Sequence, residues 1–368
     1  MPPRGPRPRL SQAVLLYTDL RLHTASSGPV EGLESLYLTL DYDGLVGAAE
    51  LRVNVAYLTG VSAEAQRRCV HEAVAAFPFG PDPAADRAAL DAFDFDAPTR
   101  ALLDCALADA AARMRGQSVA ALLGGPAGPP SHATNQTLFR DAPERVVARA
   151  KAYAARGFTQ LKLRIGFGDP AEDLALLRAL REALGPDARL SADVNGAWSL
   201  TQAEALLAPL AEVGLDYLEQ PTAPDRLDDA AALARRAPFP IMLDESAGGP
   251  AAVARACEIE SPLLLHLKLV KIGGLDRLTD AVRLARGAGH DVMIGQMNEG
   301  ALATAAALSA AAALGPRFAE LYGADGLVND PADGLTYGDG RVTAADATGI
   351  GAALVGDTAP LTATEMAL

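Results

Sequence analysis

The feature that most restricts the fold of this chain is a unit of one apolar strand and one helix, which recurs about every 25 residues. The expected strands read TQLKLRI, RLSADVN, DYLEQP, PIMLDES, LLLHLKL and DVMIGQ, and segments with helical spacing lie between them. Asp169-Pro170 is a typical helix start before a helix that ends at Gly185, and Ser199 with Gln202 predicts a capping box. Alternation of this kind predicts βαβ units and a parallel sheet.

Such units either close into a barrel or form an open nucleotide-binding sheet. The open sheet should carry a glycine-rich turn after its first strand, and RIGFGDP lacks the third glycine of that turn. A charged residue ends each of several expected strands instead, namely Lys162, Asp193, Glu219, Asp244 and Lys268. In a barrel these ends form one ring at the face where barrel enzymes hold their active sites, so we expect a barrel.

The chain before residue 129 has a different pattern. Residues 10 to 60 predict strands with a hairpin at Asp43-Gly44, and residues 62 to 79 and 98 to 123 predict helices. The break GGPAGPP marks a domain boundary, and we interpret the basic, proline-rich residues 1 to 9 as a loose tail.

Composition argues against several classes of protein. Half of the 368 residues are apolar, which suffices for a large core and more than one domain. A net charge of −14 argues against nucleic acid and anionic membranes as partners. Cys69, Cys105 and Cys257 lack metal-ligand spacing, and free thiols are typical of a reducing cytosol, so we expect a cytoplasmic protein.

Three of the strand-end residues are acids about 25 positions apart: Asp193, Glu219 and Asp244. Three carboxylates at close range repel one another unless a cation lies between them. Oxygen ligands favour a hard ion, so Mg²⁺ is the expected cofactor and Mn²⁺ the substitute. The alternative is three unrelated acids that cap the following helices, and their common register favours the metal site.

Basic residues flank the expected metal. Lys162 and Arg164 come from an earlier strand and Lys268 from a later one, so they should face each other with the substrate between them. This layout suits removal of a proton next to a carboxylate, because Mg²⁺ stabilises the developing enolate and a lysine takes the proton. Neighbouring cations would lower the pKa of that lysine and make it a base.

The ordered pieces LKLRIG, ADVNGAW, YLEQP, LDES, LKLVKIGG and, more loosely, GQMNEG resemble the enolase superfamily in its muconate-lactonizing-enzyme subgroup. The resemblance implies an α+β capping domain over residues 10–128, a (β/α)₇β modified TIM barrel over 129–324, and a C-terminal segment over 325–368 that returns to the cap. It also implies that Asp193, Glu219 and Asp244 bind the metal, that Lys268 is the base on one face, and that Lys162 orients the substrate carboxylate.

Arg164 departs from the family pattern, which usually has a second lysine, the base of the other face, at this position. Arginine stays protonated and is a poor proton acceptor, but it holds a carboxylate or a leaving oxygen well. The arginine therefore favours one-base chemistry, such as dehydration or cycloisomerisation with Lys268 as base. The alternatives are a racemase or epimerase of an amino-acid derivative or dipeptide that uses Lys162 and Lys268, and a non-catalytic binding protein.

His266 should share the inward face of its strand with Lys268, as a hydrogen-bonded core residue or as a group that sets the pKa of Lys268. MIGQMNEG has no histidine, which disfavours a mandelate-racemase arrangement. Glu245 should point away from Asp244, and Lys271 should be structural. Substrate or metal-shell contacts are expected from further polar residues: Asn135, Asn195, Gln220, Gln296, Asn298 and Glu299. We expect a small carboxylate substrate and a homo-oligomer.

Overall fold

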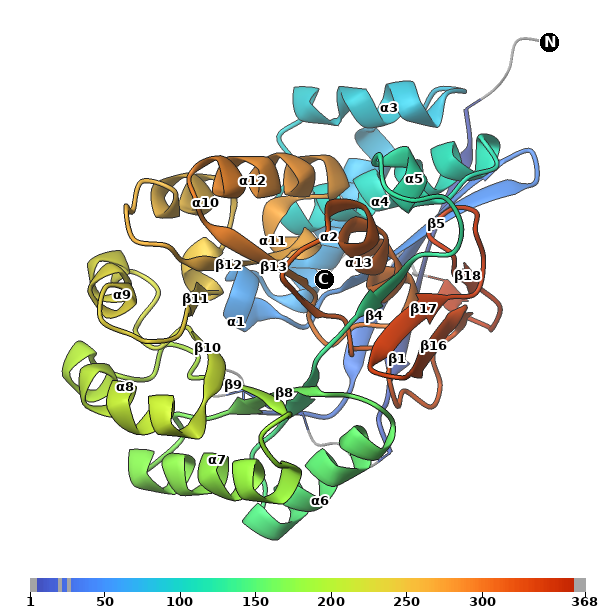
Figure 1. The fold of residues 1–368 in the computed structure, drawn as a ribbon. Helices are drawn as coiled ribbons and strands as arrows, with labels where there is room; N and C mark the ends of the chain where they lie inside the picture. The colour runs from blue at the N-terminus through green and yellow to red at the C-terminus, as the bar shows by residue number, and fades with distance from the viewer. Residues whose placement is uncertain (1–4, 19–21, 25–27, 361–368) are drawn as a thin grey trace.

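The structure, a computed structural model, describes residues 5–18, 22–24 and 28–360 (Figure 1). Within residues 129 to 324, all of them described, eight strands form one parallel sheet in which each strand pairs with the next along the chain. They are β7 (Gln136–Leu138), β8 (Gln160–Arg164), β9 (Arg189–Asp193), β10 (Leu215–Glu219), β11 (Ile241–Leu243), β12 (Leu264–Lys268), β13 (Asp291–Gly295) and β14 (Phe318–Glu320). The N–H of Asn135 donates to the carbonyl of Ala319 at 3.1 Å, so the first strand meets the last. The predicted barrel is confirmed.

Helices alternate with these strands in the (β/α)₇β order. They are α6 (Pro143–Ala155), α7 (Pro170–Leu184), α8 (Leu200–Val213), α9 (Leu227–Ala234), α10 (Pro250–Ala256), α12 (Leu275–Gly287) and α13 (Ala301–Leu314). A short helix α11 (Leu269–Ile272) follows β12, and a 3₁₀ turn η2 (Glu245–Ala247) follows β11. In Figure 1 the helices surround the strands on the outside.

The helix ends follow the predicted signals. Asp169 accepts a hydrogen bond from the first turn of α7, and Gly185 ends that helix. Ser199 and Gln202 form the predicted capping box of α8, which ends at Gly214 in the left-handed conformation. These signals fix the points at which the helices stop and the next strands begin.

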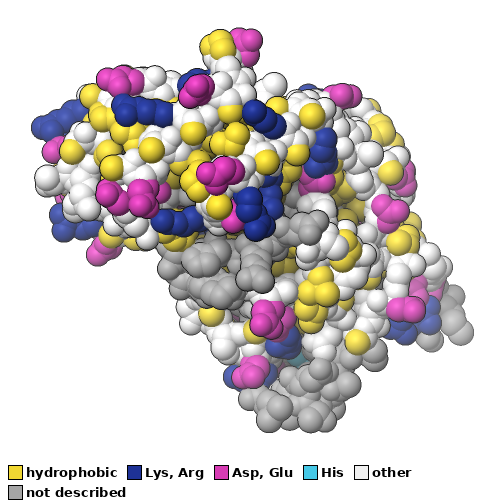
Figure 2. Space-filling model, turned by 90° about the horizontal axis from the view of Figure 1, so that it is seen from below, with side chains coloured by type: hydrophobic (Ala, Val, Ile, Leu, Met, Phe, Trp, Pro, Cys, Tyr) yellow, Lys and Arg dark blue, Asp and Glu magenta, His cyan; other side chains and the backbone are white. Residues whose placement is uncertain are grey.

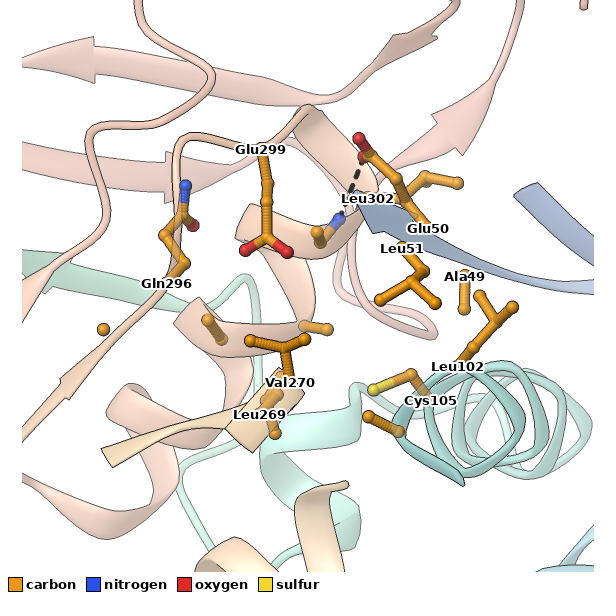
Figure 3. A pocket seen from close by; sticks show the side chains of 15 residues that line it. Ala49, Glu50, Leu51, Leu102, Cys105, Leu269, Val270, Gln296, Glu299 and Leu302 are labelled. Carbon is orange, nitrogen blue, oxygen red and sulfur yellow. Dashed lines mark hydrogen bonds between the residues drawn. The ribbon is translucent and has the colours of Figure 1, made fainter. Parts of the chain in front are cut away.

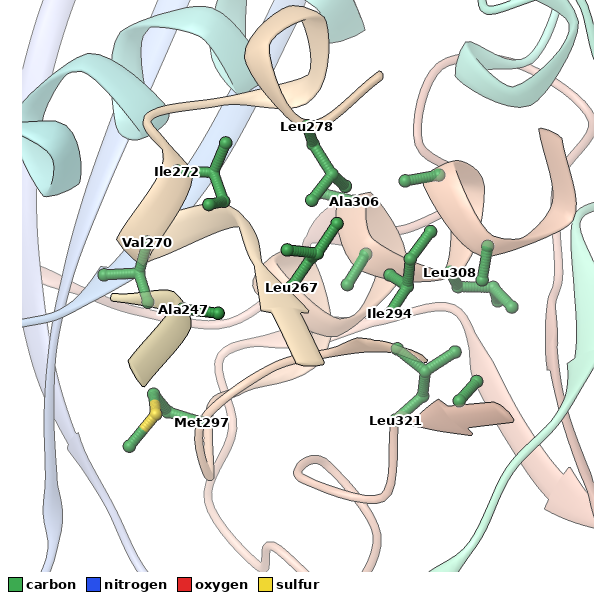
Figure 4. Packing of buried hydrophobic residues seen from close by; sticks show 14 of the residues in the cluster. Ala247, Leu267, Val270, Ile272, Leu278, Ile294, Met297, Ala306, Leu308 and Leu321 are labelled. Atoms are coloured by element: carbon green, nitrogen blue, oxygen red, sulfur yellow. The ribbon is translucent and has the colours of Figure 1, made fainter. Parts of the chain in front are cut away.

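Alternation along the strands stacks the barrel interior in layers. One apolar layer is a separate cluster of Tyr217, Met242, Leu264, Met293 and Phe318. Two residues further along the same strands stand Glu219, Asp244, His266, Gly295 and Glu320. The polar layer of the barrel interior therefore packs directly against an apolar layer. On the outer side of the sheet, Leu267 and Ile294 pack with Leu278 of α12 and Ala306 of α13 (Figure 4).

Three strands before the barrel and one C-terminal strand form an antiparallel sheet in the order β19-β1-β4-β5. Its strands are β1 (Arg7–Leu15), β4 (Leu33–Tyr42), β5 (Leu45–Arg52) and β19 (Ala359–Pro360). Asp43 and Gly44, at the predicted hairpin between β4 and β5, have φ values of 53° and 100°, as a tight hairpin turn requires. The sheet is followed by α1 (Ala56–Thr59), α2 (Ala63–Ala76), α3 (Pro83–Ala89), η1 (Leu90–Ala92), α4 (Ala97–Met114) and α5 (Val119–Leu122).

The predicted loose tail over residues 1 to 9 is wrong in part. Arg7, Pro8 and Arg9 belong to β1 and pair with β4, while residues 1 to 4 lie outside the described residues. Proline fits here because β19 pairs only with Ser11 and Gln12 in the described chain, so Pro8 sits where β1 has one partner strand. The domain boundaries at residues 128 and 324 stay predictions.

The remaining short strands are β2 (Leu22–Thr24), β3 (Gly28–Val30), β6 (Ser131–Ala133), β15 (Ala332–Asp333), β16 (Leu335–Gly338), β17 (Arg341–Ala344) and β18 (Ala353–Leu354). The C-terminal strands tie the two parts of the chain together, because β17 pairs with β6 and β19 pairs with β1.

Helix α4 lies between the cap sheet and the barrel. Nearly all of its residues are buried, and the backbone of Gly47 in β5 packs so closely on it that a Cβ there would lie 2.5 Å from the Ala106 carbonyl. On its other side, the buried Arg100 donates to Asp276 at 2.8 Å and to the Gly273 carbonyl at 2.6 Å. Asp104 accepts the N–H of Leu275, at the start of α12. The cap is thus bound to the barrel by buried charges as well as by apolar packing.

Acidic and basic side chains are interspersed on the face of the molecule drawn in Figure 2. The mixture matters because a nucleic-acid site would need a continuous basic surface. Among the described helices, none combines the length and the apolar character that crossing a membrane would require.

Candidate active site

The barrel brings the predicted strand-end charges into one buried cluster. Lys162 Nζ lies 2.8 Å from Glu219 Oε2 and 3.7 Å from Asp193 Oδ2. Lys268 Nζ lies 2.7 Å from Asp244 Oδ2 on the neighbouring strand. All five side chains are buried, so their charges interact through protein rather than through water. These distances show that the five residues lie together at one face of the barrel, as the sequence predicts.

The carboxylates in this cluster are crowded. Burial and the charge of Glu219 raise the pKa of Asp193 to about 6, and burial also raises the pKa of Glu219. Burial alone would raise the pKa of Asp244 as well, but Lys268 and Lys271 hold it well below its usual range. A divalent cation would relieve the repulsion among these acids, so the donor set fits one.

Ligand atoms of Glu219, Asp244 and His266 lie within 4.8 Å of one another, close enough to share a metal ion. His266 Nδ1 is 2.9 Å from Glu219 Oε1 and 3.8 Å from Asp244 Oδ1. Burial and Lys268 hold the pKa of His266 well below its usual range, so the ring is neutral. His266 is therefore a hydrogen-bonded residue of the barrel interior, and its ring needs Gly295, where a Cβ would lie 2.0 Å from Nε2.

Glu320 belongs to this cluster and was missed by the sequence analysis. Its Oε2 lies 2.5 Å from Lys162 Nζ and accepts from Asn135 Nδ2 at 3.1 Å. Burial opposes its ionisation, but Lys162 and other cations lower the pKa of Glu320 to about 2. The signal was present, since Glu320 ends the eighth strand as the other charged residues end theirs.

The predicted orientation of Glu245 is wrong. Strand alternation stops at Leu243, where the backbone turns into η2, so Glu245 stays on the side of the cluster and accepts from Asn195 Nδ2 at 3.1 Å. Burial and the charges of Asp244 and Asp193 raise the pKa of Glu245 to about 7.

Lys271 fits the structural role predicted for it. It donates to the side chain and carbonyl of Asp244 at 2.6 and 2.7 Å and to the carbonyl of His266 at 2.9 Å. These three bonds hold the ends of β11 and β12 together.

Arg164 ends β8 beside Asp193, and its side chain is only 10% exposed. Its guanidinium lies over the ring of Phe139 at 5.1 Å, and its Nε is 3.8 Å from Asp193 Oδ2. Neither Nε nor Nη1 makes a hydrogen bond to a described residue, although both atoms are buried. Buried arginine donors without a partner are costly, so this position is built to receive an acceptor.

The other predicted polar residues divide into groups. Asn135 and Asn195 join the charged cluster through Glu320 and through Asp193, to which Asn195 Nδ2 donates at 3.3 Å. Asn298 ties the barrel to the preceding sheet, because it donates to Tyr17 Oη at 3.1 Å and its carbonyl accepts from Arg52.

Gln296 and Glu299 line a cavity of about 20 Å³ between the barrel and the cap, roughly the room that one water needs (Figure 3). In Figure 3 the side chains of Glu50 from β5 and Cys105 from α4 lie on the cap side of this cavity. Both amide atoms of Gln296 lack a hydrogen-bond partner among the described residues. Gln296 and Glu299 therefore lie at the junction of cap and barrel.

Comparison with known proteins gives the family. The family model of the enolase C-terminal domain-like proteins matches residues 145–358. The chain is 34% identical over 255 residues to the L-Lys-D/L-Arg epimerase of Methylococcus capsulatus, which covers 68% of this chain and 71% of the relative. It is 31% identical over 261 residues to muconate cycloisomerase 1 of Rhodococcus opacus, covering 69% of each.

A solved structure agrees with these matches. The dipeptide epimerase of Methylococcus capsulatus, complexed with Mg and the dipeptide L-Arg-D-Lys, superposes with a TM-score of 0.87 and 27% identity, over 95% of this chain and 99% of that one. The fold, the order of the charged strand ends and these relatives agree, and the chain belongs to the enolase superfamily as an enzyme of its muconate-lactonizing-enzyme-like subgroup.

Proposed function

We propose that this enzyme removes the proton α to a carboxylate of a small-molecule substrate in a Mg²⁺-dependent one-base reaction, a dehydration or a cycloisomerisation, with Lys268 as the base. The observation that carries the proposal is Arg164, whose buried Nε and Nη1 make no hydrogen bond to a described residue and which stands where the family pattern has a second lysine. A guanidinium stays protonated, so this face of the site offers a hydrogen-bond donor and no base.

Asp193, Glu219 and Asp244 would hold the metal, with Mn²⁺ as a substitute for Mg²⁺. When bound, the ion supplies positive charge that stabilises an enolate as it forms. The support from the structure is the crowding of these carboxylates, whose burial keeps bulk solvent from screening their charges.

The two lysines have different surroundings. Lys162 is held between Glu219 Oε2 at 2.8 Å and Glu320 Oε2 at 2.5 Å, so its ammonium is fixed and suits the binding of a carboxylate. Among the described residues, Lys268 has one carboxylate at hydrogen-bond distance, Asp244 Oδ2, which would be a metal ligand in the proposed site. Burial alone would lower the pKa of Lys268, but Asp244 and Glu320 raise it, contrary to the expected lowering, and a cation bound to Asp244 would oppose that rise. We therefore assign proton removal to Lys268 and substrate orientation to Lys162.

Arg164 would bind the oxygen that leaves in a dehydration, or a second carboxylate of the substrate. Its stacking on Phe139 fixes the plane of the guanidinium, and Nε and Nη1, which bond no described residue, present two donors. The match to a muconate cycloisomerase is compatible with this chemistry.

A second candidate is a racemase or epimerase of an amino-acid derivative or dipeptide that uses Lys162 and Lys268. The match to an L-Lys-D/L-Arg epimerase favours it. It requires Lys162 to give up a proton although two carboxylates lie within hydrogen-bond distance of its ammonium.

Turnover in D₂O separates the two candidates. A panel of dipeptides, N-acyl amino acids and hydroxy acids is incubated with the enzyme and Mg²⁺, and substrate and product are followed by ¹H NMR. A one-base lyase or cycloisomerase gives product without interconverting the substrate epimers, whereas deuterium at the α-carbon of both recovered epimers would establish the epimerase instead.

Lys268→Ala tests the base. We expect the variant to lose at least about 100-fold in α-proton removal, the scale typical of a missing general base. Lys151→Ala, on the exposed face of α6, is the matched control and should react like the wild type. Wild-type exchange in Lys268→Ala would refute the assignment.

A further inference from the structure

Gln220 directly follows Glu219 and is 1% exposed. Its Oε1 accepts the backbone N–H groups of Asp244 at 3.0 Å and Ser246 at 3.1 Å. Its Nε2 donates to the Thr222 carbonyl at 2.9 Å and to Ser246 Oγ at 2.8 Å. A glutamine amide has two donor and two acceptor positions, and protein atoms fill all four. Gln220 is therefore neither a solvated loop residue nor free to bind substrate.

The backbone of Gln220 makes a connection in the opposite direction. Its carbonyl accepts the N–H of Gly196 at 2.7 Å, in the loop that follows Asp193. Its own N–H donates to the Met242 carbonyl at 2.8 Å, on the strand that leads to Asp244. One residue thus links the ends of β9, β10 and β11, the three strands that carry Asp193, Glu219 and Asp244.

The backbone conformation of Gln220 is unusual. Its φ is 38°, in the left-handed region that non-glycine residues rarely adopt. Such a conformation costs free energy and persists where surrounding contacts impose it, which is common at functional sites. The four side-chain bonds of Gln220 provide those contacts.

We propose that Gln220 is the positioning residue of the metal centre: by bonding the loops after three strands, it sets the spacing of Asp193, Glu219 and Asp244 and thereby the affinity for Mg²⁺. This inference rests on the proposed metal site. It does not depend on whether the reaction is an elimination, a cycloisomerisation or an epimerisation.

Gln220→Met tests the proposal, because methionine has nearly the same length and fills the space without the hydrogen bonds. Mg²⁺ binding to the full-length protein is measured by isothermal titration calorimetry, without substrate, and folding by circular dichroism. We expect the dissociation constant for Mg²⁺ to rise by about 10- to 100-fold, the range typical for residues that orient metal ligands.

Gln66→Met is the matched control. Gln66 is also a buried glutamine, and its Nε2 donates to Asp96 Oδ1 and Thr99 Oγ1, both at 2.9 Å, within the cap. It should lose thermal stability as Gln220→Met does but keep the wild-type affinity for Mg²⁺. Equal weakening in both variants would show a general loss of stability and overturn the positioning role.

The remaining outcomes are also decisive. A folded Gln220→Met protein with wild-type Mg²⁺ affinity overturns the proposal. If Gln220→Met does not fold, Ser246→Ala decides, since it removes one partner of the Gln220 amide. We expect about a threefold rise in its dissociation constant, and an unchanged value overturns the proposal. A wild-type protein that does not bind Mg²⁺ overturns the metal site itself, whereas the D₂O experiment alone judges the reaction.

Discussion

At the scale of single residues, this site differs from one in which two lysines face each other as bases across the substrate. In the proposed site, Lys268 lies on one side of the substrate and Arg164 on the other, with a guanidinium whose Nε and Nη1 make no hydrogen bond within the described parts of the chain. An arginine in this position donates hydrogen bonds but does not accept protons at ordinary pH. If the proposed reaction is correct, the identity of this one side chain decides between one-base and two-base chemistry.

Arg164→Lys should shift the enzyme toward epimerisation. The shorter ammonium loses the two-pronged grip on an oxygen, so we expect turnover of the native substrate to fall by about 10- to 1000-fold. A lysine can accept a proton, so deuterium exchange with inversion should rise above the wild-type level. ¹H NMR in D₂O measures both quantities. Unchanged turnover and unchanged exchange would show that Arg164 does not contact the reacting groups.

At the scale of elements, the N-terminus of α13 carries an unusual pair of acids. Glu50 of β5 accepts the Gly300 N–H at 2.8 Å, and Asp330 accepts the Ala301 N–H at 2.7 Å. Burial and the charge of Asp330 raise the pKa of Glu50 to about 8. The helix terminus favours the charged form, but burial outweighs it. Cap and barrel thus meet at a carboxyl group that is protonated at neutral pH.

Glu50→Gln should flatten the dependence of stability on pH. In the wild type this carboxyl binds a proton more tightly when folded, so its contribution is full below about pH 4.5 and is lost as pH rises toward 8. Glutamine cannot ionise. We expect the variant to gain a few kcal/mol relative to the wild type between pH 5 and 8, at about 1.4 kcal/mol per pK unit.

Urea unfolding at several pH values measures this difference. Glu64→Gln, which changes an exposed acid in the first turn of α2, is the matched control. Its free energy of unfolding should depend on pH as that of the wild type does. Parallel curves for Glu50→Gln would mean that Glu50 is ionised in the folded protein.

Elements also show what the sequence could predict. The position of Asp193, Glu219, Asp244 and Lys268 at the ends of expected strands predicted that they meet at one face of a barrel, and the structure brings them together. Alternation failed for Glu245 because β11 ends at Leu243 and a 3₁₀ turn follows, which the local sequence does not signal. Alternation would have found Glu320, two residues after the buried Phe318, but β14 is only three residues long and gives too short a pattern to stand out in the sequence.

Contacts between distant segments were beyond the sequence. The start of β1 at Arg7 depends on pairing with Asp41, 34 positions away, and local composition indicated a loose tail instead. The four bonds of Gln220 depend likewise on where β11 lies beside β10. A single sequence contains no direct record of such distances, so the register of neighbouring loops had to come from the structure.

At the scale of the whole molecule, metal and stability should be coupled. Burial and the mutual repulsion of Asp193 and Glu219 destabilise the folded chain when both are ionised, and an ion that binds only the folded state stabilises it. At a free Mg²⁺ concentration 100 times its dissociation constant, we expect about 2.7 kcal/mol of added stability and a higher Tm than in EDTA. Differential scanning calorimetry measures the shift.

Asp193→Asn gives the sharper form of this prediction. The variant lacks one of the crowded acids, so its Tm in EDTA should exceed that of the wild type, while the gain from Mg²⁺ should nearly vanish. A wild-type gain from Mg²⁺ in Asp193→Asn would place the ion elsewhere.

The pairing of β1 has a consequence for folding while the chain is being synthesised. One edge of β1 pairs with β4, and the other edge pairs with β19. Near the end of β1, the side chain of Asn329 forms hydrogen bonds with the carbonyl of Val14 and the N–H of Leu16. These partners leave the ribosome more than 300 residues after β1 does. Until then β1 has an exposed, unpaired edge, and such edges promote aggregation through strand pairing between chains. β1 is therefore completed only after residues 329 to 360 have been made, and its protection during translation depends on a segment far downstream in the chain.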